Sequence, residues 1–142
     1  MFNNARIRWL KIGAILTLGS GLLIAVAAMP ALQGPVNLMA DFIFFPLDSA
    51  QSVDTVTARL FSAITGGLMV GIGVMLWVVA TELCPRDPAL GRRLILFGVG
   101  SWYVVDCAMS VAAGAPLNVL FNTGFLLIFV LPAWGLADST SS

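Results

Sequence analysis

The sequence contains no histidine and has few charged side chains. Asp, Glu, Lys and Arg make up only 10% of its 142 residues and 59% are hydrophobic. Soluble domains usually carry about 25% charged residues. A chain this small could not cover its surface with so few polar groups. The scarcity of charge therefore excludes an ordinary soluble domain and indicates an integral membrane protein.

The missing histidine also removes a common haem and zinc ligand and the usual acid–base residue near neutral pH. The two cysteines, Cys84 and Cys107, are not spaced as a CxxC redox or zinc motif. A formal net charge of zero provides no basic patch for nucleic acid. We therefore expect no metal, no cofactor and no nucleic-acid partner. No residue is predicted to be catalytic, and a non-enzymatic role is favoured.

Long apolar runs are what the sequence does contain. A membrane-crossing helix needs about 20 mostly apolar residues, and four stretches qualify: residues 9–29, 56–81, 94–113 and 117–134. Proline and glycine punctuate the ends of these stretches. The predicted fold is all-α, a single domain formed by a bundle of four transmembrane helices.

The first apolar run has two interpretations. Its basic start and alanine-rich end resemble a secretory signal peptide. However, the run is long for such a segment, and Gly13, Thr17, Gly21 and Ala25 recur every four residues. Because a stripe of small residues lets helices approach closely in lipid, this pattern favours a retained span.

Positive charge is unevenly distributed along the chain. Six of the seven basic residues lie in segments 6–11 and 86–93, whereas the loop 30–55 carries three aspartates. Lys and Arg remain on the cytoplasmic side of a membrane. The sequence therefore predicts a multi-pass protein of the bacterial inner membrane, with both termini and the 82–93 loop in the cytoplasm and the 30–55 loop outside.

The first outer loop is unusually apolar. Its stretch GPVNLMADFIFFPLD, residues 34–48, is too short to span a membrane and too apolar for water. One interpretation is a short interfacial helix that begins at Pro35 and inserts Phe42, Phe44 and Phe45 into the membrane surface. The other interpretation is an irregular hydrophobic loop folded over the bundle.

Two ionisable residues lie inside predicted spans, where charges are expensive. Asp106 precedes Gly114 by eight residues, which places it about 12 Å below the outer end of its helix. Arg59 follows Asp54 by five residues, which places it about 7 Å deep. The arginine side chain could reach the level of the acid, so we expect an Arg59–Asp106 pair.

Further polar side chains are predicted at the same level. Tyr103 and Ser110 share the helical face of Asp106, and Asn118 and Asn122 lie near the outer end of the fourth span. The candidate ligand-binding set is Arg59, Tyr103, Asp106, Ser110, Asn118 and Asn122. A structural role stays open beside solute binding and a proton- or redox-linked role, because polar side chains also hold membrane helices in register.

The second span also carries Gly67 and Gly71 at GxxxG spacing. This spacing permits close helix packing either inside the bundle or at a dimer seam. We expect it to act inside the bundle.

The second span opens TARLFSAITGGLMVGIGVMLW, with Arg59 near its head, and the third span contains Asp106. With four short helices, these features resemble the DoxX-like group of small bacterial membrane proteins over about residues 8–135. The resemblance implies a four-helix membrane fold. Some members of that group are associated with quinone-linked oxidoreductases, and many have no assigned activity. The long apolar outer loop departs from the group.

Three functional hypotheses follow. The first is an accessory or structural subunit in the lipid bilayer, with a membrane protein partner or a second copy of the chain. The second is a binder or transporter of a small solute or ion, which a funnel open to the outer face and lined by Arg59, Asp106 and Asn122 would favour. The third is a quinone-linked oxidoreductase subunit, which needs a lipid-accessible slot near Tyr103 or Trp102.

Overall fold

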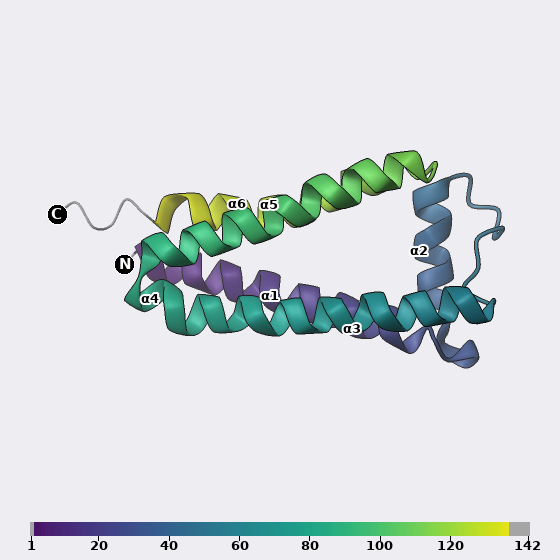
Figure 1. The fold of residues 1–142 in the computed structure, drawn as a ribbon, viewed down its shortest axis with the longest axis horizontal. Helices are drawn as coiled ribbons and strands as arrows, with labels where there is room; N and C mark the ends of the chain where they lie inside the picture. Colours follow the sequence, from purple (N-terminus) through teal and green to yellow (C-terminus); the bar gives the residue numbers. More distant parts are fainter. Residues whose placement is uncertain (1, 137–142) are drawn as a thin grey trace.

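The long helices form two antiparallel pairs in the computed structural model, which describes residues 2–136 (Figure 1). In the first pair, α1 (Phe2–Val26) packs along α3 (Val56–Val78). In the second, α5 (Pro88–Ala112) packs along α6 (Asn118–Trp134). The pairs meet where α1 begins and α6 ends, and they diverge toward the opposite end (Figure 1). The expected all-helical fold is confirmed for the described residues, which contain no strand.

Three helical segments are long and apolar enough to cross a membrane: Asn4–Val26, Val56–Arg86 and Pro88–Ala112. The fourth, α6, is apolar but has only 17 residues. Such a helix rises about 26 Å, slightly less than the hydrocarbon core of a bilayer at about 30 Å. Three helices therefore support the membrane character that the composition predicts. The fourth span stays a prediction.

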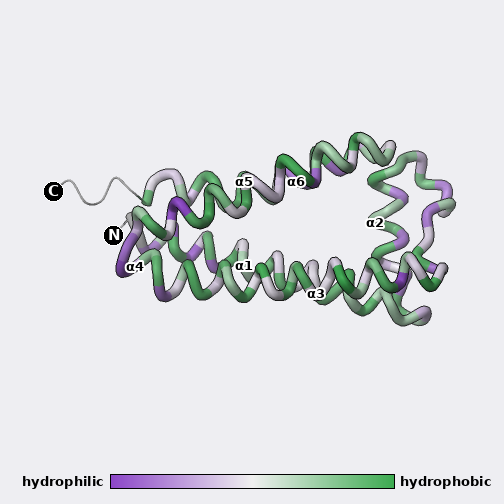
Figure 2. Tube along the Cα trace, viewed as in Figure 1, coloured by the Kyte–Doolittle hydropathy of each residue, from purple (hydrophilic) through white to green (hydrophobic). Residues whose placement is uncertain are grey.

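Large apolar side chains lie mainly on the outside of the helices. Phe97 and Leu120 are each 70% exposed, and Leu131 is 68% exposed. Figure 2 shows hydrophobic residues along the length of the four long helices, with hydrophilic positions gathered toward the two ends. A soluble monomer rarely exposes apolar surface on this scale, whereas lipid tails cover it without cost.

Small residues bring α1 and α3 into close contact. A Cβ atom added to Gly66 would overlap the backbone of Gly21 and Ala25. Ser62, also buried in this seam, donates its hydroxyl to the carbonyl of Ile24. The small-residue stripe predicted on the first span is thus a packing face, and α3 presents a matching one.

The GxxxG pair on α3 faces away from this seam. Gly67 and Gly71 are exposed, and a Cβ at either position would meet nothing within 4 Å. The prediction that they pack inside the bundle is therefore wrong. The reason is that α1 occupies the neighbouring face of α3, through Gly66 and Gly73.

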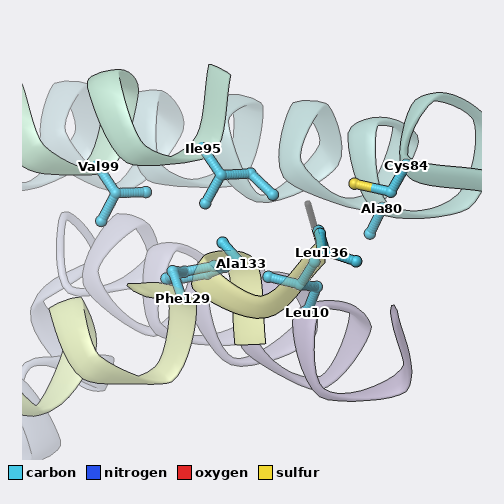
Figure 3. Close-up of a cluster of buried hydrophobic side chains, with 8 residues drawn as sticks. All are labelled: Leu10, Ala80, Cys84, Ile95, Val99, Phe129, Ala133 and Leu136. Atoms are coloured by element: carbon cyan, nitrogen blue, oxygen red, sulfur yellow. The ribbon is translucent and has the colours of Figure 1, made fainter. Parts of the chain in front are cut away.

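A compact apolar core closes the end of the molecule where the two pairs meet. In Figure 3, Ile95 and Val99 of α5 point toward Phe129 and Ala133 of α6. The complete cluster is Leu10, Ala80, Cys84, Ile95, Val99, Phe129, Ala133 and Leu136. The guanidinium of Arg6 donates to the carbonyl of Gly135 at the same end, and so fastens α1 to the end of α6.

The segment expected as the 82–93 loop is almost entirely helical. The helix that begins as α3 continues through a π-helical turn, η2 (Val79–Leu83), and through α4 (Cys84–Arg86). Only Asp87 separates α4 from α5. Its carboxylate caps α5 by accepting a hydrogen bond from the amide of Leu90 over 2.9 Å. The helices therefore extend beyond the predicted spans 56–81 and 94–113 on this side.

A short helix occupies the first loop, as one of the two sequence interpretations predicted. After the 3-10 turn η1 (Pro30–Leu32), α2 (Gly34–Phe44) stands across the divergent end of the two pairs (Figure 1). Pro35 lies in its first turn, where its missing amide hydrogen removes no helical bond. Three exposed aromatic side chains end this segment: Phe42, Phe44 and Phe45. Their insertion into a membrane surface stays a prediction.

Polar side chains on one face of α2 and just before it hold the following loop. Gln33 Nε2 donates to the carbonyl of Val53 over 2.7 Å, and Asn37 Oδ1 accepts from the amide of the same residue over 3.0 Å. Asp41 is buried and accepts from the amide of Gln51 over 3.3 Å. The spacing of four between these residues signals one helical face, a pattern that the sequence interpretation missed.

Candidate functional site

Asp106 lies at the centre of a hydrogen-bond network between α5 and α6. Its Oδ1 atom accepts from Ser110 Oγ at 3.0 Å, from Asn118 Nδ2 at 3.1 Å and from Asn122 Nδ2 at 2.9 Å. Asn118 Nδ2 also donates to Ser110 Oγ at 2.8 Å, and Asn122 Nδ2 approaches Cys107 Sγ at 3.7 Å. Each amide group thus uses both of its hydrogens within the network.

The turn between α5 and α6 sets the register of this network. Gly114 adopts a positive φ of 80° just after α5. The amide of Gly114 donates to the carbonyl of Val111, and the amide of Ala115 donates to that of Ser110. This pair of bonds is a Schellman cap, which ends the helix sharply. The chain therefore reverses at once and returns Asn118 alongside the last turns of α5.

The second carboxylate oxygen of Asp106 is left open. In the described part of the chain, no hydrogen bond reaches Oδ2, and the side-chain oxygens of Asn118 and Asn122 also accept none. Three donors on Oδ1, together with the nearby N-terminus of α6, suit a negatively charged carboxylate. Asp106 and Asn118 are half-buried and Asn122 is buried, but none of the three open oxygens is completely enclosed.

Arg59 does not pair with Asp106, which corrects the sequence prediction. Among residues 4–136, the structure contains one ion pair, between Glu82 and Arg86. Arg59 lies in the first turn of α3, where α3 has diverged from α5 (Figure 1). The depths estimated for Arg59 and Asp106 along their helices were similar, but α3 and α5 are not neighbours at that level (Figure 1).

The charge of Arg59 acts instead on the loop that precedes α3. The pKa of Asp54 is lowered, mainly by the hydrogen bond that the Ser52 hydroxyl donates to its carboxylate over 2.7 Å, with a smaller contribution from the charge of Arg59. Asp54 is fully exposed, so this interaction is screened by solvent. Arg59 itself lies in the first turn of α3, directly after this loop.

Tyr103 belongs to a separate contact below Asp106. Its hydroxyl lies 2.9 Å from Thr123 Oγ1. Since Thr123 gives its own hydroxyl hydrogen to the carbonyl of Val119 over 2.7 Å, Tyr103 is the donor. Thr123 was not among the predicted site residues. Its position directly after Asn122, on the face of α6 that meets α5, is the signal that could have found it.

An apolar slot lies between the two helix pairs. Its volume is about 360 Å³, within the range of about 300–1,000 Å³ typical of small-molecule sites. Its aromatic walls include Trp102 and Phe125, whose rings meet edge to face with centroids 6.4 Å apart. Residues from the four long helices and from η2 line it: Thr17, Met69, Ile72, Met75, Leu76, Val79, Leu94, Ile95, Gly98, Val99, Trp102, Phe125 and Phe129.

The slot and the polar network share one face of α5. Ile95, Val99, Trp102 and Asp106 follow each other at steps of four, three and four residues, which is the repeat of a single helical face. Asp106 lies one turn beyond Trp102, about 6 Å along the helix axis. Asp106 is therefore the next residue on this face of α5 after the slot-lining Trp102.

The structure brings together four of the six predicted site residues: Asp106, Ser110, Asn118 and Asn122. Tyr103 and Arg59 lie outside their network. No group of three His, Cys, Asp or Glu side chains that could hold a metal ion occurs in residues 2–136. The network itself contains one carboxylate, one hydroxyl and two amide groups.

Comparisons with known proteins do not extend this description, since no family model, curated protein or solved structure matches the chain.

Proposed function

We propose that the chain is a four-span protein of the bacterial inner membrane that binds a cationic group at Asp106. One observation carries the proposal: Asp106 receives three hydrogen bonds on Oδ1 but has neither a donor on Oδ2 nor an internal cation among the described residues. An unpaired charge is costly in a low-dielectric setting. A cationic ligand at Oδ2 removes that cost.

The proposal includes the predicted topology. In the described structure, the basic residues of α1, α4 and α5 all lie at the end where α1 begins and α6 ends, and Arg59 lies at the other (Figure 1). Lys and Arg favour the cytoplasmic side. We therefore place both termini in the cytoplasm, retain α1 as a span and let the 17 residues of α6 complete the fourth crossing.

The proposal is tested by the thermal stability of the purified protein in a neutral detergent. A ligand that binds the folded state raises Tm. n-Butylammonium chloride should raise the Tm of the wild type above the value in matched KCl, and should not raise that of Asp106→Asn. Equal effects of the two salts on the wild type would contradict a cation site.

A second candidate, the accessory subunit, is supported by the open face of α3. Leu60, Ile64, Gly67, Gly71 and Val74 are all exposed at helical spacing, and glycine at such a face permits close helix association in lipid. Gly67→Leu should then reduce the particle mass measured by light scattering in detergent. An unchanged mass would remove this support.

The quinone-linked hypothesis has one supporting observation, the apolar slot beside Trp102. It shares this observation with the binder, and a neutral quinone makes no use of the open oxygen of Asp106. Membership of the DoxX-like group is proposed on the four-helix arrangement and on Arg59 and Asp106 alone.

A further inference from the structure

The slot and Asp106 together suggest which class of ligand the site takes. Resting on the proposed function, we infer that the ligand is an amphiphilic amine, with an aromatic or branched apolar body in the slot and an ammonium group at Asp106 Oδ2. Each half of this description comes from a separate part of the molecule.

The polar half follows from the unused acceptors. Oδ2 of Asp106 and the side-chain oxygens of Asn118 and Asn122 accept no hydrogen bond from the described residues. A primary ammonium carries three donors and no acceptor. Such a group can donate to Oδ2 and neutralise the carboxylate in one step, which neither a neutral ligand nor an anion can do, and it has further hydrogens for any oxygen within its reach.

The apolar half follows from the lining of the slot. Thr17 supplies the one hydroxyl in that lining, and it donates to the carbonyl of Gly13 over 2.9 Å, so it is already satisfied. Trp102 and Phe125, whose rings meet edge to face, are the slot-lining residues of α5 and α6 that lie nearest in sequence to Asp106 and Asn122. Aromatic faces also attract a cation that passes over them. A hydrophilic cation would leave this chamber unfilled.

The spacing between the halves sets the length of the ligand. Trp102 and Asp106 are one helical turn apart, about 6 Å. A chain of four methylene groups can bridge that distance. 4-Phenylbutylammonium is therefore a suitable probe, and n-butylammonium is the same probe without its ring.

Gly98 offers a variant that fills the slot without disturbing the fold. It lines the slot, and a Cβ added there meets nothing within 4 Å. Gly98→Leu should therefore occupy ligand space. Gly100, on the same helix, is equally unhindered and lies outside the slot lining, so Gly100→Leu is the matched control.

The experiment measures the affinity of both amines for the intact protein in detergent, from the rise in Tm with amine concentration. We expect 4-phenylbutylammonium to bind the wild type at least tenfold more tightly than n-butylammonium does. Gly98→Leu should remove that advantage, and a cooperative melting transition near that of the wild type shows that this variant is folded. Gly100→Leu should behave as the wild type, and Asp106→Asn should bind neither amine.

Three results would overturn the inference. If the two amines bind with equal affinity and Gly98→Leu changes neither affinity, the protein has a cation site at Asp106 but its ligand does not extend into the slot. If neither amine binds in a manner that depends on Asp106, the proposed function fails as well. If 4-phenyl-1-butanol or decylubiquinone binds wild type and Asp106→Asn equally and as tightly as the phenyl amine, the slot serves a neutral ligand.

Discussion

Asn122 donates its side-chain amide to Asp106 Oδ1 over 2.9 Å and thereby joins α6 to α5 at a buried polar contact. Asp106 lies near the end of α5 and Asn122 near the start of α6, and these helix ends belong to the part of the molecule where the two pairs have diverged (Figure 1). It orients the carboxylate so that one oxygen is fully used and the other remains free.

Loss of the Asn122 amide should destabilise the protein. Asn122→Ala removes one of three donors from a charged acceptor in a low-dielectric region, which we expect to cost about 1–3 kcal/mol. Leu120→Ala, at a position on the same helix that is 70% exposed, is the control and should have a much smaller effect. Equal losses of stability in the two variants, measured by chemical unfolding in detergent, would show that the Asn122–Asp106 bond carries little energy.

Arg59 and Asp106 should act independently. Because the structure shows no ion pair between them, the effects of Arg59→Ala and Asp106→Asn on the free energy of unfolding should add to within about 0.5 kcal/mol in the double variant. A double variant that loses at least about 1 kcal/mol less than the sum would indicate direct pairing. That result would restore the structural interpretation of the two charges.

The α1–α3 seam should tolerate no added methyl group. Gly66→Ala places a Cβ against the backbone of α1, and overpacking of this kind costs about 1–3 kcal/mol. Gly67→Ala, one residue away, meets open space and should leave Tm nearly unchanged. A similar fall in Tm for both variants would mean that the outer face of α3 is also covered.

Single-cysteine variants test the orientation in the membrane. In a background in which Cys84 and Cys107 are replaced by serine, Ser49→Cys should react with a membrane-impermeant maleimide added to intact cells. Arg86→Cys should react only after the membrane is permeabilised. The opposite pattern would reverse the orientation that we propose.

The helices and most of the polar network could be predicted from the sequence because both follow local rules. Runs of apolar residues indicate spans, and a spacing of three or four places Asp106 and Ser110 on one face. Asn118 and Asn122 could be matched to them because the intervening turn is short and α6 is antiparallel to α5.

The neighbours of each helix could not be predicted in the same way. Depth along a helix placed Arg59 near the level of Asp106, but depth says nothing about which helix lies next to which. Which helices are neighbours is determined by close packing along the whole contact between them. The close approach of Gly66 to Gly21 and Ala25 makes α1 the neighbour of α3. The same packing turns Gly67 outward and lets α3 and α5 diverge.

The carboxyl carbon of Asp106 reports most directly on whether its second oxygen is open to a cation. The measurement is a titration of the ¹³C-labelled aspartate carboxyl signals of the protein in detergent, with the Asp106 signal assigned by its absence from Asp106→Asn. We predict that n-butylammonium chloride shifts this signal to saturation, whereas matched KCl does not and the exposed Asp48 and Asp54 signals respond to both salts alike. An Asp106 signal that stays fixed over the whole titration would contradict a cation site at Asp106.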